Sequence, residues 1–359
     1  MRTRQEHGPP RILGAARDLA LPALREAVDG LHPDLARLCG YHFGWCGIDG
    51  SLVESKEGKF LRAALVLLCG QAVGAPAADV LPGAVAVELV HNFSLLHDDI
   101  MDNDDHRRGR PSAWVAFGLA NAILAGDALI GLALDQLTGL KNEAGRTATR
   151  MLAEALNEMI RGQAADLALD SAPAAEVTAE HYMAATYKTT ALLYSCAAIG
   201  VTLGGGSAEV ATVLGGACRK LGLSWQMAND LENIWGDPAV TGKPVQGDLR
   251  QAKKTLPVIA ALRSRSAAGT QLAGAFSDTA PAESDLYAQA MLIERAGGRE
   301  HVETLSRRYL DQALAELTTA LPASAVVTEL ADLFRFIVPS VARSGAAGGG
   351  EVRALGAAG

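Results

Sequence analysis

The chain has few aromatic residues, no paired cysteines and no apolar run of membrane-spanning length. Aromatic residues make up 5% of its 359 residues and hydrophobic residues 49%, so alanine, leucine and valine must supply most of the core. That composition favours helices over a β-sandwich. The five cysteines are odd in number and form no CxxC pair, which argues against a disulfide framework and a zinc site.

A secretory leader and an excess of basic residues are also missing. The first ten residues contain no apolar segment, so we expect a soluble, cytoplasmic protein without a transmembrane segment. The 40 acidic residues outnumber the 32 basic ones and give a formal charge of −8. An acidic chain whose arginines cluster in motifs is a poor candidate for nucleic-acid binding.

Helical periodicity dominates the chain and predicts an all-α fold. The periodic stretches are residues 15–28, 59–72, 79–100, 115–139, 146–169, 179–203, 208–235, 254–263 and 285–321. The last stretch must be interrupted near residues 295–298, and no β-run with hairpin punctuation stands out. We predict one helical domain at 12–343, between a flexible N-terminus at 1–11 and a disordered, Gly/Ala-rich tail at 344–359.

The most informative segment is an acidic helix end followed by arginines. Asp98 and Asp102 are four residues apart, so on a helix they project from one face, with Asp99 beside them. Carboxylates this close repel each other unless a cation separates them, and Mg²⁺ that carries substrate phosphates suits the arrangement. Arg107 and Arg108 add forked donors for phosphate oxygens. We favour a metal–diphosphate site over a solvated helix end, because the preceding residues read as a buried helix.

A second polar cluster lies far downstream. Asn229 and Asn233 are four residues apart with Asp230 adjacent, which repeats the geometry of the first cluster with less charge. Lys243 and Lys253 follow it. Two facing helices that each bring oxygens from one face could hold a metal cluster with a diphosphate between them.

Three further elements are weak signals on their own. Lys59 and Arg62 are three residues apart at a predicted helix start, where backbone N–H groups also favour an anion. His91 lies two turns before the acidic cluster on the same helix face, although a lone histidine there is more often part of the core. Lys188 and Thr189 offer another phosphate donor and a hydroxyl.

Together these elements resemble the trans-isoprenyl diphosphate synthases, the polyprenyl synthetase family, which includes geranylgeranyl and farnesyl diphosphate synthases. The most specific feature is Asp-Asp-x-x-Asp followed by Arg-Arg-Gly and preceded by Gly-Lys-x-x-Arg and His91. Further matches follow in the family's order, namely Gln163, Asp166, Lys188, Thr189, Gln226, Gly242 and Lys243. The resemblance covers the chain from Gly58 to about Pro257.

The resemblance implies a bundle of mostly antiparallel helices around a central cavity, the isoprenoid synthase fold, and commonly a homodimer. The residues that it implies for Mg²⁺ are Asp98, Asp99, Asp102, Asn229, Asp230 and Asn233. Those implied for an allylic diphosphate are Arg107, Lys188, Lys243 and Lys253, and those for isopentenyl diphosphate are Lys59, Arg62, His91 and Arg108. Oxygens of Thr189 and Gln226 could stabilise an allylic cation.

Such a site would ionise the allylic C–O bond, because Mg²⁺ and cationic side chains neutralise the departing diphosphate. The isopentenyl double bond would then attack the allylic cation, and a proton would leave, most simply to the released diphosphate. In this family the residues five and four before the first aspartate line the cavity floor, and here they are Phe93 and Ser94. One bulky ring beside a small residue favours a C20 all-trans product over C15.

The second motif departs from the family's Asp-Asp-x-x-Asp, because Asn229 and Asn233 replace its first and third acids. A neutral amide oxygen binds Mg²⁺ more weakly than a carboxylate. Together with Asp237, these asparagines also have the spacing of the Asn/Ser/Glu metal triad of class I terpene cyclases.

Three hypotheses therefore remain. We favour a chain-elongating synthase, because the residues implied for isopentenyl diphosphate are retained. The alternatives are a cyclase or irregular, head-to-middle-type prenyltransferase that acts on an allylic diphosphate, and a non-catalytic subunit.

Overall fold

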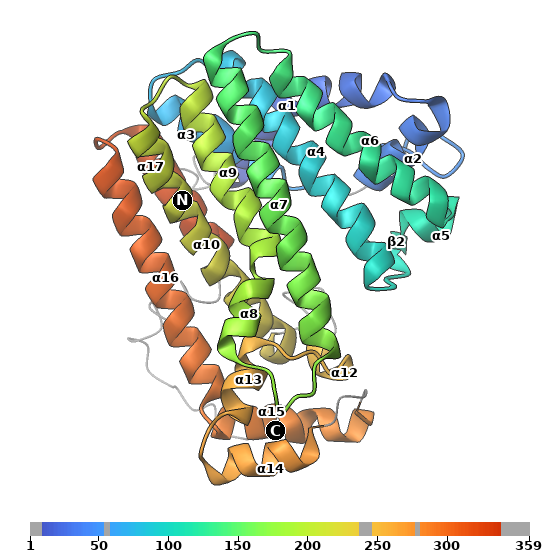
Figure 1. Cartoon of the computed structure of the whole chain (residues 1–359), viewed down its shortest axis with the longest axis vertical. Helices are drawn as coiled ribbons and strands as arrows, with labels where there is room; N and C mark the ends of the chain where they lie inside the picture. The colour runs from blue at the N-terminus through green and yellow to red at the C-terminus, as the bar shows by residue number, and fades with distance from the viewer. Residues whose placement is uncertain (1–8, 54–57, 237–245, 277–280, 339–359) are drawn as a thin grey trace, which may run out of the picture. The chain divides into compact units, whose positions relative to one another are not determined.

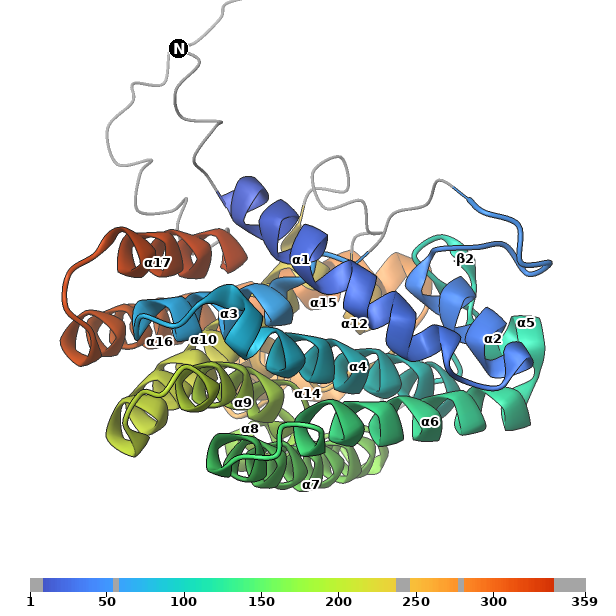
Figure 2. The same ribbon diagram turned by 90° about the horizontal axis from the view of Figure 1, so that it is seen from above.

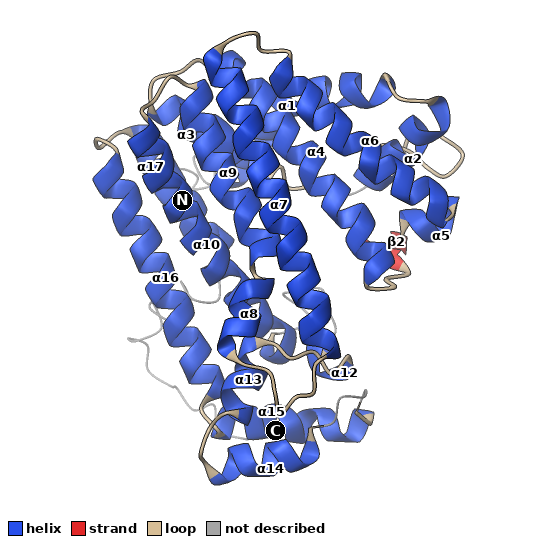
Figure 3. Cartoon of the chain, viewed as in Figure 1, coloured by secondary structure: helices blue, strands red, loops and turns tan. Residues whose placement is uncertain are grey.

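The computed structural model describes residues 9–53, 58–236, 246–276 and 281–338, and their regular structure is almost entirely helical (Figures 1 and 3). The helices are α1 (Pro9–Asp29), α2 (Pro33–Phe43), α3 (Leu61–Ala72), α4 (Ala77–Met101), α5 (Ala113–Phe117), α6 (Leu119–Thr138), α7 (Glu143–Ser171), α8 (Ala179–Ala185), α9 (Tyr187–Leu203), α10 (Ala208–Trp235), α12 (Gly247–Arg250), α13 (Leu256–Leu262), α14 (Ala267–Ala275), α15 (Glu283–Arg295), α16 (Gly298–Ala320) and α17 (Ala325–Ile337). Two short strands, β1 (His106–Arg107) and β2 (Arg110–Pro111), complete the described elements. The all-α prediction is confirmed.

Most predicted helices are present, with ends shifted by a few residues. The helix α10 has its predicted bounds, and the interruption predicted near 295–298 separates α15 from α16. The predicted helix over 115–139 is divided at Gly118, whose φ of 88° ends α5 before α6 begins. The predicted helix over 179–203 is divided at Thr186, which caps the end of α8.

The sequence pattern missed α2, α12, α14, α17 and the β1–β2 hairpin. These elements are short or begin in segments that look like loops. Helix α14 begins at Ala267 because the Ser266 side chain accepts a hydrogen bond from the backbone N–H of Gly269 and so caps the helix. Helix α2 also has common boundary residues. It begins at Pro33, and Gly44 ends it in a left-handed conformation.

The chain divides into two compact units. Unit 1 comprises residues 1–161, 187–219 and 313–333, and unit 2 comprises residues 162–186, 220–312 and 334–359. The first acidic motif therefore belongs to unit 1 and the second to unit 2. The single domain predicted at 12–343 stays a prediction. The predicted tail at 344–359 lies outside the described residues, and α1 already begins at Pro9, within the predicted N-terminal segment 1–11.

In unit 1, α4 packs against α3, α6 and α9, and these helices form its core (Figure 2). The α3–α9 packing is so close that a Cβ atom added to Gly200 would collide with the backbone of Val66, so this position requires glycine. Residues 83–90 of α4 are all buried. This packing fixes α4 in the core and thereby places the acidic residues at its C-terminal end.

Two described helices, α4 and α6, are long and apolar enough to cross a membrane by length and composition alone. In their most apolar windows, 67% of α4 but only 28% of α6 is buried within the structure. The apolar character of α4 therefore serves the core. On α6, Leu119, Ile123 and Leu124 remain exposed.

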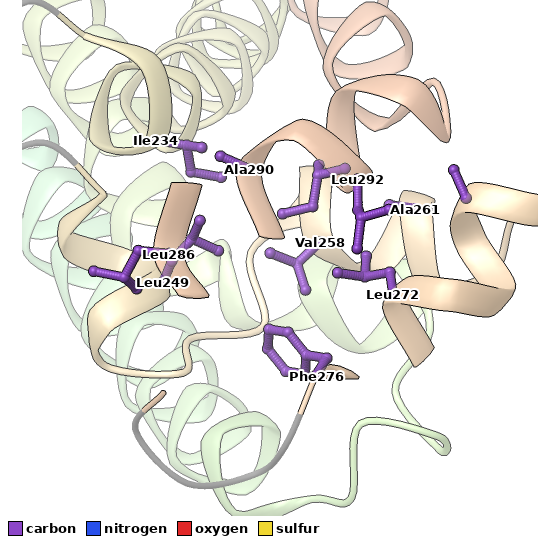
Figure 4. Close-up of a cluster of buried hydrophobic side chains, with 11 residues drawn as sticks. Ile234, Leu249, Val258, Ala261, Leu272, Phe276, Leu286, Ala290 and Leu292 are labelled. Carbon is purple, nitrogen blue, oxygen red and sulfur yellow. The ribbon is translucent and has the colours of Figure 1, made fainter. Parts of the chain in front are cut away.

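Unit 2 has its own apolar core around α13, α14 and α15 (Figure 4). Val258 of α13 and Leu272 of α14 lie beside Phe276 and are fully or largely buried. Ile234, at the end of α10, and Leu249 of α12 belong to the same cluster. The segment that carries the second polar motif is thus anchored by apolar side chains on either side of residues 237–245.

Candidate functional site

The first acidic motif forms the last turn of α4. The backbone N–H of Asp102 donates to the carbonyl of Asp98 at 2.8 Å, and Asp102 caps the helix. Asp99 is buried, with 1% of its surface exposed, and its carbonyl accepts from the N–H of Asp104 at 2.8 Å. The C-terminal end of a helix carries partial negative charge, so three carboxylates there are electrostatically unfavourable without a cation. This end of unit 1 is therefore built to receive positive charge.

Arg107 supplies part of that charge. Its Nε donates to Oδ1 of Asp99 at 2.6 Å, and its guanidinium forms an ion pair with the same oxygen. Burial raises the pKa of Asp99 above its ordinary value, although Arg107 opposes the shift. The other oxygen, Oδ2 of Asp99, is buried and has no hydrogen-bond partner among the described residues. This oxygen therefore lacks the hydrogen bond that a buried carboxylate oxygen normally has.

The motif fits Mg²⁺ that arrives with a diphosphate better than a preformed metal centre. Among the described residues, no three His, Cys, Asp or Glu side chains converge on a position that could hold a metal ion. Mg²⁺ commonly takes only one or two carboxylates and completes its shell with substrate phosphates and water. Asp98 is half-buried and Asp102 is exposed, so their carboxylates are the ones of the motif that such an ion can reach from solvent.

The arginines that follow the motif are displayed by the β1–β2 hairpin. The strands pair antiparallel, with Arg107 opposite Arg110. The two turn residues, Arg108 and Gly109, have φ values of 55° and 78°, as a type I′ turn requires. A left-handed conformation costs a side-chain-bearing residue about 1–2 kcal/mol, so Arg108 occupies a strained position. Strain of this kind is common where a side chain has a functional task.

Helix α2, which the sequence pattern missed, and the residues just after it hold two of these arginines. Nη1 of Arg108 donates to the carbonyl of His42 at 3.3 Å, and Nη2 of Arg110 donates to the carbonyl of Cys46 at 2.9 Å. The Arg110 guanidinium also lies 3.9 Å from the centre of the Tyr41 ring. Both guanidinium groups are therefore held in place by neutral groups.

Three residues predicted to bind isopentenyl diphosphate come together in unit 1. Burial lowers the pKa of His91 well below its ordinary value, and the nearby charges of Arg62 and Arg108 lower it further. Arg62 is itself buried, and its Nε has no hydrogen-bond partner among the described residues. Glu88, one turn before His91, accepts from the backbone N–H of Ala63 at 3.0 Å. Sequence reasoning missed Glu88, although a single acid within the apolar residues 80–90 of α4 was a signal.

The remaining predicted residues of unit 1 lie near helix starts. Lys59 is exposed and precedes α3, which begins at Leu61 and not at residue 59 as predicted, because Phe60 has a positive φ of 51°. Lys188 and Thr189 are half-buried in the first turn of α9. The helix predicted over 179–203 is interrupted at Thr186, so a new helix, α9, begins just before these two residues.

Phe93 and Ser94 are fixed within unit 1. The Phe93 ring is buried and meets the His97 ring edge to face, with the ring centres 4.9 Å apart. His97 packs on α6 at Gly126, where a Cβ atom would collide with the imidazole. Oγ of Ser94 donates to the carbonyl of His91 at 2.8 Å. The Phe93 ring therefore has a defined position beneath the last turns of α4.

In unit 2, the carboxylate of Asp230 is held by protein groups. It accepts from the Tyr182 hydroxyl at 2.7 Å, from Nε2 of Gln226 at 3.2 Å and from the backbone N–H of Leu256 at 3.5 Å. Burial is the main cause that raises the pKa of Asp230 to about 7. In this structure Gln226, predicted to stabilise a cation, therefore donates a hydrogen bond to Asp230, predicted to bind a metal.

The asparagines of the second motif have different surroundings. Nδ2 of Asn233 donates to both carboxylate oxygens of Asp248, at 3.2 and 3.3 Å. Asn229 is half-buried on α10. Asp248 was not among the predicted site residues, because in the sequence it stands alone in a loop-like segment.

Of the two lysines predicted for unit 2, Lys253 lies among the described residues. Lys253 is half-buried, and its backbone N–H donates to the carbonyl of Asp248 at 2.9 Å. Its neighbour Lys254 is buried and donates to the carbonyl of Asp170 at 2.8 Å. Lys243 and Asp237 lie outside the described residues. Lys254, which was not predicted, thus links the segment before α13 to the C-terminal end of α7.

Acid should destabilise the protein through His42. Burial, followed by the charges of Arg108 and Arg107, lowers the pKa of His42 to about 3. Because the folded-state pKa lies below the unfolded value near 6.5, the stability from neutral His42 is present above that pH and is lost as the pH falls towards 3. Between pH 7 and pH 5 this loss is about 2 kcal/mol.

We therefore expect His42→Gln to lose about 2 kcal/mol less free energy of unfolding than the wild type between these two pH values. Urea denaturation at pH 7 and pH 5 measures the difference. His301→Gln replaces an exposed histidine and is the control. Equal pH dependence in the wild type and His42→Gln would contradict the expectation.

Comparison with known proteins gives consistent matches over most of the chain. The model of the polyprenyl synthetase family matches residues 51–292. A (2E,6E)-farnesyl diphosphate synthase of Mycobacterium tuberculosis is 40% identical over 331 residues, which cover 91% of this chain and 92% of the relative. A geranylgeranyl diphosphate synthase of the same species is 41% identical over 313 residues, with 86% and 89% coverage. A crystal structure of a polyprenyl synthetase from Streptomyces coelicolor A3(2) matches with a TM-score of 0.87 at 41% identity, covering 91% of this chain and 99% of that one.

Proposed function

Because the chain belongs to the polyprenyl synthetase family and is a prenyltransferase, we propose that it joins isopentenyl diphosphate to an allylic diphosphate and releases a short-chain, all-trans prenyl diphosphate. The observation that carries this proposal is the arrangement at the end of α4. The acidic turn with the unpartnered Oδ2 of Asp99 lies beside arginines that neutral groups hold in place. A carboxylate turn and a cationic cluster in one unit suit two diphosphates.

Unit 1 supplies the groups for both substrates in this proposal. Asp98, Asp99 and Asp102 would hold Mg²⁺, which when bound would supply positive charge for the leaving diphosphate of the allylic substrate and so lower the barrier to C–O cleavage. Arg107 keeps Asp99 oriented while its guanidinium adds positive charge. Lys59, Arg62, His91 and Arg108 bind the diphosphate of the second substrate. Neutral His91 donates a hydrogen bond to that diphosphate without repelling the arginines around it.

The second motif contributes to the same reaction in this proposal. Asn229, Asp230 and Asn233 provide oxygens for further Mg²⁺, and Lys188, Lys243 and Lys253 bind the allylic diphosphate. Thr189 and Gln226 direct oxygens at the allylic cation. Two asparagines in place of acids weaken the metal affinity of this motif, so we expect a higher Mg²⁺ requirement than an all-aspartate motif gives.

Phe93 is proposed to limit product length. We expect Phe93→Ala to shift the main product from C20 to longer chains, because loss of the buried ring opens the floor below the acidic turn. Phosphatase treatment followed by chromatography of the released alcohols measures the product distribution. Leu38→Ala removes another buried side chain of unit 1 and controls for general loosening. An unchanged distribution in Phe93→Ala would show that this ring does not form the floor.

A homodimer and a cytoplasmic location also belong to the proposal. The exposed apolar residues Leu119, Ile123 and Leu124 of α6 give a second copy of the chain a surface to cover. The five cysteines are all unpaired and buried, which suits a reducing compartment.

A product assay tests the proposed function. The purified protein is incubated with Mg²⁺ and each allylic diphosphate from C5 to C20, with and without isopentenyl diphosphate. A longer prenyl diphosphate that forms only with isopentenyl diphosphate supports the synthase. A hydrocarbon or alcohol from an allylic diphosphate alone would favour a cyclase, and no product from any combination would favour a non-catalytic subunit.

A further inference from the structure

A half-buried arginine of α10 links three helices of unit 1. Nη2 of Arg219 donates to Oε2 of Glu158, on α7, at 2.8 Å. Its guanidinium lies 5.4 Å from the centre of the Tyr187 ring and 4.9 Å from the centre of the Tyr194 ring, both on α9. We call these four residues the Arg219 cluster. None of them is assigned to either substrate in the proposed function.

The contacts of the Arg219 cluster are partly removed from water. The side chains of Arg219 and Glu158 are 26% and 37% exposed, so their ion pair is less screened than one on the open surface. Tyr194 is half-buried and lies so close to α10 that a Cβ atom added to Gly215 would collide with its ring. The attraction between a cation and an aromatic ring also strengthens as the cation loses water. The guanidinium therefore has a fixed place between α7 and α9.

The first turn of α9 depends on contacts of this kind. Helix α9 begins at Tyr187, directly after Thr186 interrupts the helix predicted over 179–203. A helix end frays unless caps or packing stabilise it. Tyr187 is 44% exposed, so burial does little to hold this first residue. Because Tyr187 and Tyr194 are seven residues apart, they lie on one helix face, and Arg219 stabilises the first two turns of α9 by contacting both rings.

We propose that Arg219 is a positioning residue, which orders the first turn of α9 and through it directs Lys188 and Thr189 towards the allylic substrate. Lys188 and Thr189 are the next residues of that turn, so the orientation of Tyr187 about the helix axis fixes theirs. The inference rests on the proposed function for the roles of Lys188 and Thr189. Stabilisation of the turn by Arg219 does not depend on turnover.

Steady-state kinetics of Arg219→Met test the effect on each substrate separately. Methionine keeps apolar volume but removes the cation, so the turn is ordered in a smaller fraction of molecules and the apparent affinity falls by that fraction. We expect the KM for the C15 allylic diphosphate to rise ~10-fold, the loss that corresponds to a cation–π contact of a half-buried guanidinium. The KM for isopentenyl diphosphate and kcat should stay within about threefold, because saturating allylic substrate restores the turn.

Three further substitutions distinguish stabilisation of the turn from a general loss of packing. Arg219→Lys retains a cation and should bring the allylic KM to within about threefold of the wild type. Tyr187→Phe keeps the ring and should have wild-type kinetics, whereas Tyr187→Leu should behave like Arg219→Met.

Arg25→Met is the matched control. Arg25 is also half-buried, and its guanidinium lies 5.1 Å from the centre of the Trp45 ring, but it belongs to α1. Both KM values of this variant should equal those of the wild type. An allylic KM raised as much in Arg25→Met as in Arg219→Met, or equal increases in both KM values of Arg219→Met, would overturn the inference.

Hydrogen exchange of the free protein separates failure of the inference from failure of the proposed function. The amides of Ala191, Leu192 and Leu193 close the first turn of α9, because each helical N–H donates to the carbonyl four residues before it. We expect them to exchange ~10-fold faster in Arg219→Met than in the wild type, while the rest of α9 is unchanged. If the wild type forms no product but this difference is present, the proposed function fails and stabilisation of the turn by Arg219 stands. If the wild type is active and either this exchange or the allylic KM is unchanged in Arg219→Met, the inference is wrong.

Discussion

Asp98→Asn is expected to lower kcat by ~10³-fold while leaving the fold intact, because several kcal/mol of leaving-group stabilisation depend on the metal that this carboxylate holds. Asparagine keeps the size of the aspartate side chain and removes one charge beside the partial negative charge of the helix end, so the free energy of unfolding should change by no more than about 1 kcal/mol. Steady-state kinetics and thermal melting of the same preparations measure both quantities.

Asp105→Asn is the matched control for Asp98→Asn. Asp105 is exposed in the same acidic segment but lies beyond the helix turn, and its backbone carbonyl, not its side chain, accepts from the N–H of Ser112. We expect its kcat to stay within about twofold of the wild type, since it lacks a place in the metal site. Comparable losses in both variants would show that general negative charge, and not the helix-end motif, is what the reaction needs.

Arg108→Asn should affect activity and stability in opposite directions. The variant loses a guanidinium that can bind phosphate through two donors, so the KM for isopentenyl diphosphate should rise by ~100-fold. Asn-Gly is a preferred pair for a type I′ turn, whereas Arg108 holds a φ of 55° at a cost. The free energy of unfolding should therefore not fall and should rise by up to about 1 kcal/mol. Kinetics and urea denaturation measure the two effects.

Arg108→Lys separates charge from backbone strain. Lysine keeps the positive charge and the strained turn, but its single ammonium cannot reproduce the forked donor. We expect a stability equal to that of the wild type and a KM between those of the wild type and Arg108→Asn. A marked loss of stability in Arg108→Asn would mean that the hydrogen bond from Arg108 to the carbonyl of His42 outweighs the turn strain.

Local sequence patterns predicted the helical elements well where the helices are long. The bounds of α10 and the interruption between α15 and α16 follow from apolar periodicity and glycine placement. The patterns failed for α2. This helix is short, and its residues contact the hairpin region, which lies far away in the sequence. Tyr41 of α2 donates through its hydroxyl to the carbonyl of Pro111 at 2.8 Å, an interaction that no local pattern encodes.

Side-chain pairing in the candidate site was less predictable. The four-residue spacing placed Asp98 and Asp102 on one helix face, but it did not reveal that Arg107 binds Asp99. Nor did it reveal that Tyr182 and Gln226 hold Asp230. Burial decides these pairings, because a carboxylate removed from water needs the nearest donors that the fold supplies.

The sequence by itself determined the fold class, the kinds of residue available for diphosphate chemistry and their order along the chain. These depend on periodicity and spacing, which act over a few residues. Only the tertiary structure decided that Arg107 pairs with Asp99 and that Arg108 and Arg110 donate to the carbonyls of His42 and Cys46. Interactions between residues about 70 positions apart are set by how helices pack, and packing depends on the whole core at once.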